Sequence, residues 1–138
     1  MKVVVFDTNV LLDLFVFNDF RALHLKQDLI DGKIDALASP KTLAEFADVV
    51  ARPLFALSAE QQEQITLQWH GLARIIPDEA LTKAPWTCQD PDDQVFLDLA
   101  YSNKPCTLMS KDNEVLRLAK KASDAQVLIT ANYTLGTL

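Results

Sequence analysis

Residues 3–12, VVVFDTNVLL, place an aspartate, Asp7, between two segments that both look buried. The apolar run 3–6 is typical of a strand that is covered on both faces of a parallel sheet. Apolar residues resume just after Asp7, and a helix is expected to begin near Thr8. Asp7 therefore either caps that helix or has a chemical role at the end of the strand.

Short β-rich runs alternate with helical patterns along the whole chain. Ser39-Pro40 supplies an N-cap followed by a first-turn proline, and Ser58 with Gln61 forms a capping box. Gly32 and Arg52-Pro53 are expected to end helices. The expected strands are 3–6, 34–38, 73–76, 106–109 and 125–129, and the expected helices after the first cover about 20–31, 40–50, 58–70, 90–102 and 111–122, with a looser connection over 77–89. This alternation predicts an α/β domain with a mostly parallel central sheet.

Composition narrows the function classes. A chain of 138 residues, 49% hydrophobic with three glycines, is expected to form a single folded domain over 1–138. No apolar run approaches the roughly 20 residues of a membrane span, and the acidic N-terminal stretch does not resemble a signal peptide. Cys88 and Cys106 do not form a disulfide framework or a zinc site, so a cytoplasmic protein is expected. The net charge of -6 is unfavourable for a nucleic-acid partner, because phosphate binding is usually led by Lys and Arg.

Four carboxylates lie where a parallel sheet would gather them. Asp7 and Asp112 follow the first and fourth expected strands, at the edge where ligands bind in such sheets. Asp93 lies in the first turn of an expected helix, and Glu45 lies one position off the apolar stripe of another. Taken singly, each acid has a structural explanation as a helix cap, a first-turn acid or an edge residue. Asp112 would lie near the start of its helix, with Ser110 as the expected cap.

The case for a site rests on the convergence of these acids. Two carboxylates about 4 Å apart repel each other by about 4 kcal/mol at an effective dielectric near 20. Protons or divalent cations would have to offset several such repulsions in a domain of ordinary stability. Oxygen ligands without paired His or Cys favour Mg2+ or Mn2+ over Zn2+. We therefore interpret Asp7 as a metal ligand at a strand end.

Four motifs occur in the order found in PIN domains: VVVFDTNVLL, SPKTLAEFADVVARP, CQDPDDQVFLDLA and LMSKDNEVLRLA. Over about residues 1 to 120, the chain resembles the bacterial branch that contains VapC-like toxins of toxin–antitoxin pairs. The resemblance implies a three-layer α/β/α fold and a metal-dependent ribonuclease with one or two Mg2+ or Mn2+ ions. It also implies RNA as the substrate, a homodimer, and an antitoxin protein that occludes the site.

The resemblance also assigns residues. The catalytic and metal-binding acids fall on Asp7, Glu45, Asp93 and Asp112, and Asp93 is chosen within DPDD because it lies seven residues before Ala100. Thr8, Asn9 and Ser110 would hold these carboxylates or contact the scissile phosphate, and Glu114 would supply an accessory acid. Lys111 and Gln94 depart from the family pattern, which often has Gly and an acid at these positions. Neither change removes a core carboxylate.

Alternative functions remain at this stage. A haloacid-dehalogenase-like phosphatase would need an acid two residues after Asp7, where this chain has Asn9, and an amide cannot donate a catalytic proton. A phospho-receiver domain would need an acidic pair after the first strand, which Thr8 interrupts. A catalytically silent PIN-like interaction module is the non-enzymatic alternative. Residues 9–17, NVLLDLFVF, are more apolar than one helix face needs, which suggests a partner interface or a helix buried on several sides.

Overall fold

The computed structural model describes residues 1–134 and contains a five-stranded sheet in the order β3-β2-β1-β4-β5. All four strand pairs are parallel, which confirms the predicted α/β class. The continuous apolar run of β1 fits its central place, since its neighbours on both sides are strands and both of its faces are covered. The strands are β1 (Lys2–Phe6), β2 (Ile34–Ala38), β3 (Arg74–Ile75), β4 (Cys106–Met109) and β5 (Val127–Thr130).

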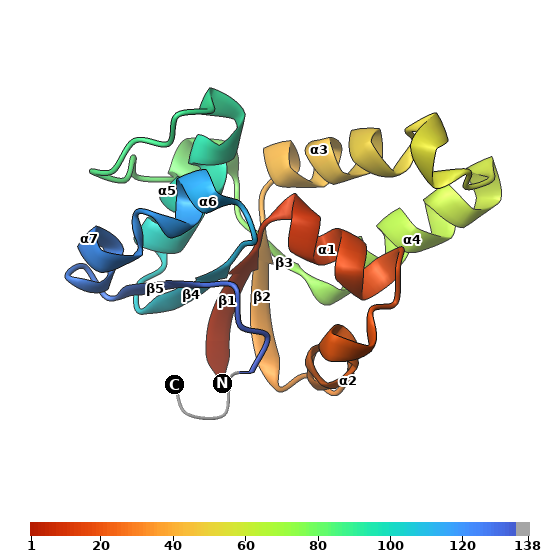
Figure 1. Ribbon diagram of the computed structural model, residues 1–138, viewed down its shortest axis with the longest axis horizontal. Helices are drawn as coiled ribbons and strands as arrows, with labels where there is room; N and C mark the ends of the chain where they lie inside the picture. Colours follow the sequence, from red (N-terminus) through yellow and green to blue (C-terminus); the bar gives the residue numbers. More distant parts are fainter. Residues whose placement is uncertain (135–138) are drawn as a thin grey trace.

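Helices cover both faces of the sheet and make three layers (Figure 1). One face carries α1, α2, α3 and α4, and the other carries α5, α6 and α7. The α-helices are α1 (Thr8–Phe15), α2 (Leu23–Ile30), α3 (Pro40–Val50), α4 (Ala59–Leu72), α5 (Gln94–Ser102), α6 (Asn113–Leu116) and α7 (Ala119–Ser123). Short 3-10 turns are η1 (Phe20–Ala22), η2 (Pro53–Phe55), η3 (Asp78–Ala80) and η4 (Pro91–Asp93).

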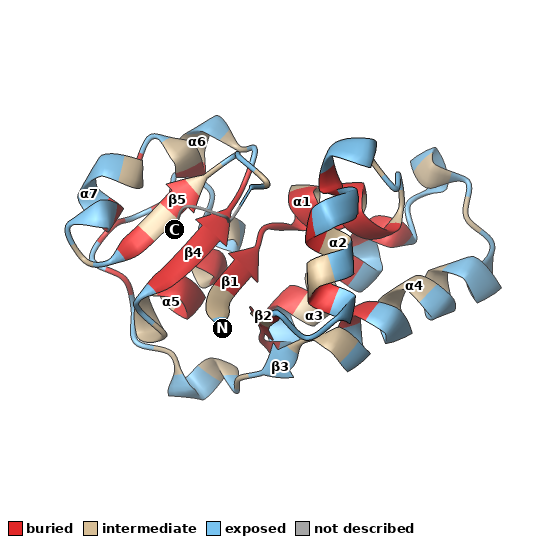
Figure 2. Ribbon diagram, turned by 90° about the horizontal axis from the view of Figure 1, so that it is seen from below, coloured by how far each residue is buried: buried red, intermediate tan, exposed pale blue. Residues whose placement is uncertain are grey.

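Alternate residues of the central strands enter two separate cores. Val4 and Phe6 of β1 pack with α1 to α4, whereas Val5 of the same strand packs with α5 to α7. This follows from the two-residue period of a strand, which sends successive side chains to opposite faces. Figure 2 shows the result, with buried residues concentrated in the central strands and in α1 and exposed residues on the outer sides of α4 and α7.

The chain reverses its direction of travel across the sheet between β1 and β4. From β1 the order runs outward through β2 to β3, and the chain then returns to β4 on the other side of β1. The helix after β1 packs on one face, and the helices after β4 pack on the other. The two carboxyl ends therefore flank a crevice with no helix crossing it, which is where open α/β sheets bind ligands.

Most predicted helix ends are confirmed by their caps. Ser39 and Ser58 both form capping boxes, and Asp90 accepts a hydrogen bond from the Asp92 backbone N–H. Gly32 lies just past α2 with φ of 75°, the left-handed conformation that glycine adopts without strain. These local signals reported helix termini correctly because each satisfies backbone groups that the helix itself leaves unpaired.

Five predicted elements differ in the structure. The helices expected over 20–31 and 90–102 begin as the 3-10 turns η1 and η4. The helix expected over 111–122 is divided into α6 and α7 by a turn at Arg117 and Leu118. The strand expected over 73–76 shrinks to the two exposed residues of β3 at the sheet edge. The last strand begins only at Val127, because Gln126 has φ of 65° and cannot continue an extended strand.

Because the core lies on both faces of the sheet, replacing a buried leucine should lower the free energy of unfolding much more than replacing an exposed one. Leu37 of β2 is 1% exposed, whereas Leu67 of α4 is 61% exposed. Leu37→Ala should lower the free energy of unfolding by about 2–5 kcal/mol through lost burial and a cavity. Leu67→Ala should change it by less than about 0.5 kcal/mol. Urea denaturation measures both, and equal effects would contradict the assigned positions.

Candidate metal centre

Three carboxylates meet at the crevice between β1 and β4. Asp7, Asp93 and Asp112 each offer one oxygen, and these three atoms all lie within 4.8 Å of one another. Asp7 directly follows β1, Asp112 lies three residues after β4, and Asp93 ends η4 just before α5. The predicted convergence of these acids is therefore present, and residues separated by more than 100 positions form one cluster.

Asp7 is the most buried of the three acids, at 4% exposure. One carboxylate oxygen accepts a hydrogen bond from the Thr8 backbone N–H at 2.7 Å, and the other accepts from the Ser110 hydroxyl at 2.6 Å. Burial raises the pKa of Asp7, and the negative charges of Glu45 and Asp112 act in the same direction against the two hydrogen bonds. Asp7 thus caps α1 and also faces the other acids, so both explanations of its position apply.

Ser110 connects the two strand-end acids. Its hydroxyl donates to Asp7 and accepts from the Asp112 backbone N–H at 3.0 Å. Asp112 itself caps α6 by accepting from the Glu114 backbone N–H at 2.9 Å. The sequence had suggested Ser110 as that helix cap; the structure instead gives the cap to Asp112 and leaves Ser110, which is fully buried, to fix Asp112 relative to Asp7.

The pKa of Asp93 lies well above that of an ordinary aspartate. Burial is the largest cause that raises the pKa of Asp93, to about 7, followed by the charges of Asp7 and Asp90 and by a hydrogen bond with Asp112. That hydrogen bond between two carboxyl groups requires a proton on one of them. Without a metal ion, the cluster therefore holds a proton near neutral pH, as closely spaced like charges require.

Glu45 lies beside the cluster but outside the three-residue set. It is half-buried on α3, and its carboxylate accepts a 2.6 Å hydrogen bond from the Thr8 hydroxyl. Thr8 thus bridges two acids, since its backbone N–H binds Asp7 and its hydroxyl binds Glu45. The contact fixes the direction in which Glu45 faces the cluster.

Asn9 and Glu114 occupy different positions relative to the cluster. The Asn9 amide nitrogen lies 3.5 Å from an Asp7 oxygen, and its amide oxygen accepts from the Lys111 backbone N–H at 3.1 Å. Glu114 lies on α6, is not part of the three-residue set, and pairs with Arg117 at 2.9 Å. Asn9 therefore supports the site directly, whereas the accessory role of Glu114 stays a prediction.

The donor set fits a hard divalent cation. All three candidate ligands are carboxylate oxygens, and within residues 1–134 no His or Cys joins the set. Mg2+ binds oxygen at about 2.0–2.1 Å, so two of its ligands lie at most about 4 Å apart. A bound cation would also replace the proton that Asp93 and Asp112 share.

The loop before Asp90 is fastened to α5 by contacts that the sequence did not reveal. The Gln94 amide accepts from the Cys88 backbone N–H at 2.8 Å and donates to the Trp86 carbonyl at 2.9 Å and to Asp98 at 3.1 Å. An acid at position 94 could not donate these last two hydrogen bonds when ionised. Gln94 therefore holds the loop that leads to Asp93.

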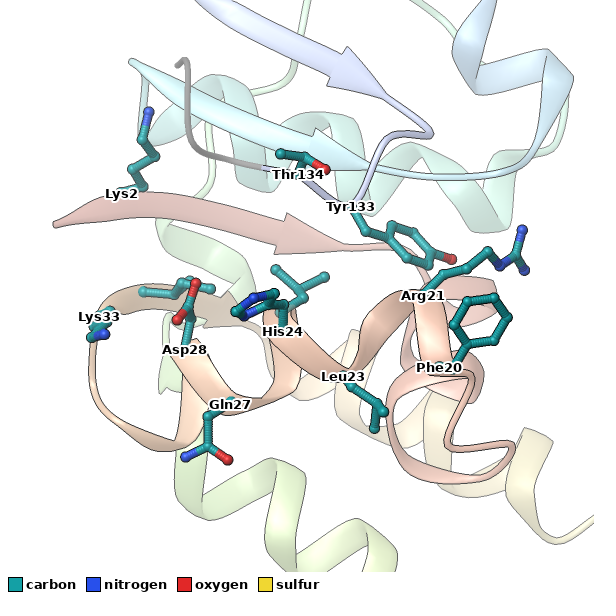
Figure 3. Close-up of a pocket in the computed structure, with 12 residues that line it drawn as sticks. Lys2, Phe20, Arg21, Leu23, His24, Gln27, Asp28, Lys33, Tyr133 and Thr134 are labelled. Atoms are coloured by element: carbon teal, nitrogen blue, oxygen red, sulfur yellow. The ribbon is translucent and has the colours of Figure 1, made fainter.

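Two of the cavities in the structure differ in their position relative to the candidate acids. A cleft of about 720 Å³ opens between α3 and α5 beside Glu45, and its charged lining includes Lys41, Lys83 and Asp92. A second cavity, of about 700 Å³, lies between α2 and the segment after β5 and is lined by residues such as His24 and Tyr133 (Figure 3). Of the four candidate acids, Glu45 lines the first cleft, and none lines the second cavity.

The sequence of the chain matches a known protein family. A family model described as PIN domain matches residues 3–112, a range that contains Asp7, Glu45, Asp93 and Asp112. The comparison with curated proteins gives no match.

The raised pKa of Asp93 predicts an inverse pH dependence of stability for the metal-free protein. Folded Asp93 keeps its proton up to about pH 7, whereas an unfolded aspartate loses it near pH 4. Between these values the folded state binds more protons, so this group's contribution to the free energy of unfolding falls as pH rises from about 4 to 7. Asp93→Asn should therefore be more stable than the wild type at pH 8 by about 0.5–1 kcal/mol, a value reduced for solvent screening.

Urea unfolding in EDTA at pH 8 and pH 4.5 measures this difference. At pH 4.5 the two proteins should have nearly equal stability, because Asp93 is then protonated in the folded state. Asp124→Asn, which changes an exposed acid after α7, serves as the matched control and should not alter the pH dependence. A less stable Asp93→Asn at pH 8 would mean that burial and the neighbouring acids do not raise the pKa of Asp93 in the folded protein.

Proposed function

The chain belongs to the PIN domain family, and on this premise we propose that it is a cytoplasmic endoribonuclease that requires Mg2+ or Mn2+. PIN domains are generally nucleases that use divalent metals, so the family supports a hydrolase acting on nucleic acid. The observation that carries the proposal is the convergence of Asp7, Asp93 and Asp112, which places three carboxylate donors where they could hold a divalent cation. Family membership leaves the phosphatase alternative without support.

The three aspartates are proposed as the principal metal ligands. A bound divalent cation lowers the pKa of a water ligand and stabilises charge on phosphoryl oxygens. Asp7 is held by the Thr8 backbone and by Ser110, so its oxygens are oriented before any ligand binds. Asp112 is fixed through its own backbone N–H to the same Ser110. These contacts act as the outer hydrogen bonds that orient metal ligands and raise affinity.

Glu45 is proposed to accept a proton from the attacking water, or to bind the cation directly or through water. The Thr8 hydroxyl holds one of its oxygens, which leaves the other free to face the cluster. Its place beside the cleft between α3 and α5 puts it where a phosphodiester would enter. Water attack on phosphorus with departure of the 3′-oxygen gives 5′-phosphate and 3′-hydroxyl ends.

The acidic surroundings make RNA binding depend on the cation. The four site acids account for much of the net charge of -6, and bound metal would offset them. Lys41 and Lys83 line the cleft, but acids outnumber them there. Lys111 and Arg117 are already paired with Asp13 and Glu114. Weak and salt-sensitive RNA binding is therefore expected.

A role as the toxin of a toxin–antitoxin pair is the finer part of the proposal. It rests on the resemblance of the motifs to the VapC-like branch, whose members are inhibited by an antitoxin protein. A silent PIN-like interaction module is the alternative outcome, and it would keep the fold without cleaving RNA. The neighbouring reading frame offers a direct check, since a small protein with a DNA-binding head would support the toxin role.

A homodimer is proposed from exposed apolar side chains around the end of α1. Most apolar residues in 9–17 are buried within the chain itself, so that stretch alone no longer requires a partner. Phe17, Phe20 and Leu54 are instead 57%, 81% and 83% exposed, and the Phe17 ring contacts Phe55. Exposed apolar groups close to one another are typical of protein interfaces.

The function is tested with labelled single-stranded RNA of mixed sequence and with total tRNA. Wild type should cleave RNA with Mn2+ or Mg2+ and not in EDTA, leaving 5′-phosphate ends. Asp93→Asn should lower the rate by about 100-fold or more, because a displaced cation removes several kcal/mol of transition-state stabilisation. Cleavage that survives EDTA or this substitution would contradict the proposal.

Asp35→Asn is the matched control for that assay. It removes a carboxylate that pairs with Arg74 at the other edge of the sheet, away from the cluster. Its rate should equal that of the wild type. If Mn2+ binds to the wild type but no RNA is cleaved, the interaction module becomes the better account.

The dimer is tested by light scattering over a range of protein concentrations. Wild type should have twice the mass of the chain, and Leu54→Asp should shift the protein toward the monomer, because a charge would have to be buried at the interface. Asp124→Asn serves as a control on a different surface. A monomeric wild type would contradict the dimer and leave the exposed residues to a different protein partner.

A further inference from the structure

Asp13 is a buried carboxylate that the proposed chemistry does not use. It lies on α1 with 3% exposure, one helical turn after Asn9. One of its oxygens accepts from the Lys111 ammonium group at 2.7 Å and from the Tyr133 hydroxyl at 2.5 Å. A buried charge persists in a fold only when it is paired, so these two contacts explain how Asp13 is tolerated in an otherwise apolar helix.

The partners of Asp13 come from segments far away in sequence. Lys111 lies 98 positions along the chain and Tyr133 lies 120 positions along it. Figure 3 shows Tyr133 reaching from the segment after β5 toward Arg21 near the start of α2. Burial is the largest cause that raises the pKa of Tyr133, followed by its hydrogen bond to Asp13, so Tyr133 stays a neutral donor to that carboxylate.

Lys111 stands between two residues of the metal centre. Ser110 on one side contacts Asp7, and Asp112 on the other side belongs to the three-residue cluster. The Lys111 backbone N–H donates to Asn9, and its side chain crosses to Asp13 on the same face of α1. The loop between β4 and α6 is therefore attached to α1 at two points beyond the Ser110 contact.

We propose that Asp13 is a positioning residue of the metal centre, which through its ion pair with Lys111 fixes the loop that carries Asp112. The proposal rests on the proposed function, because it takes the three aspartates as metal ligands. Asp112 must stay within reach of Asp7 and Asp93, and a loop that moves away from α1 would carry its carboxylate out of the ligand set.

The test is calorimetric titration of Mn2+ into metal-free wild type, Asp13→Asn, Lys111→Met and the double variant, each checked for folding by circular dichroism. Each single variant should bind Mn2+ about 10- to 100-fold more weakly, the usual effect of losing a residue that orients a metal ligand. The double variant should bind no more weakly than the weaker single variant, since both changes break one ion pair. Asp35→Asn, which breaks an ion pair of similar length away from the site, should bind as the wild type does.

A purely structural role would lower stability and leave Mn2+ affinity unchanged, and that result would overturn the inference. Additive losses in the double variant would overturn it as well. If Asp13→Asn does not fold, Lys111→Met decides the question alone, because Lys111 is 39% exposed and its loss costs the core less. If wild type binds no Mn2+, the metal centre itself fails and the inference falls with it. If wild type binds Mn2+, Asp93→Asn does not, and Asp13→Asn binds normally, only the role of Asp13 is lost.

Discussion

Electrostatic repulsion among three carboxylates is the constraint on which the rest of this site depends. Asp7, Asp93 and Asp112 each offer an oxygen within 4.8 Å of the others. Burial of Asp93, followed by the charges of Asp7 and Asp90 and the contact with Asp112, raises the pKa of Asp93 to about 7. A fold could avoid this cost by moving any one acid into solvent. Instead, hydrophobic burial on both faces of the sheet brings the ends of β1 and β4 side by side and keeps Asp7 buried between them. The hydrophobic core therefore keeps three carboxylates together although they repel one another.

The groups that hold the acids are neutral donors rather than cations. Thr8, Ser110 and backbone N–H groups orient Asp7, Glu45 and Asp112, and none of them cancels a charge. Lys111 is the cationic neighbour next in sequence to Asp112, and its ammonium group is directed to Asp13. The negative charge of the three aspartates is therefore not cancelled by a paired Lys or Arg. A site for a divalent cation requires this negative charge.

The sequence predicted the parts of this structure that depend on local chemistry or on a regular period. The apolar run of β1, the capping boxes at Ser39 and Ser58 and the place of Asp7 and Asp112 at one sheet edge all follow from such rules. The choice of Asp93 over Asp92 depended on the family resemblance, because both acids suit a helix start. The contacts of Thr8, Asn9 and Ser110 with the acids were expected in kind, although Ser110 links Asp7 to Asp112 instead of capping α6. Contacts between distant segments were not predictable: nothing local indicates that Asp13 meets Lys111 and Tyr133, and only the presence of an acid inside an apolar helix could have raised the question.

Proton release on Mn2+ binding is the measurement that tests the central claim most directly. Calorimetric titration of metal-free wild type at pH 6, in two buffers with different ionisation enthalpies, counts the protons displaced by each ion. We expect about one proton per ion at pH 6 and close to none at pH 8.5, because the cation replaces the proton that Asp93 shares with Asp112. Asp93→Asn should lose the high-affinity binding. Absence of binding at millimolar Mn2+, or binding without proton release at pH 6, would contradict a metal centre built from these carboxylates.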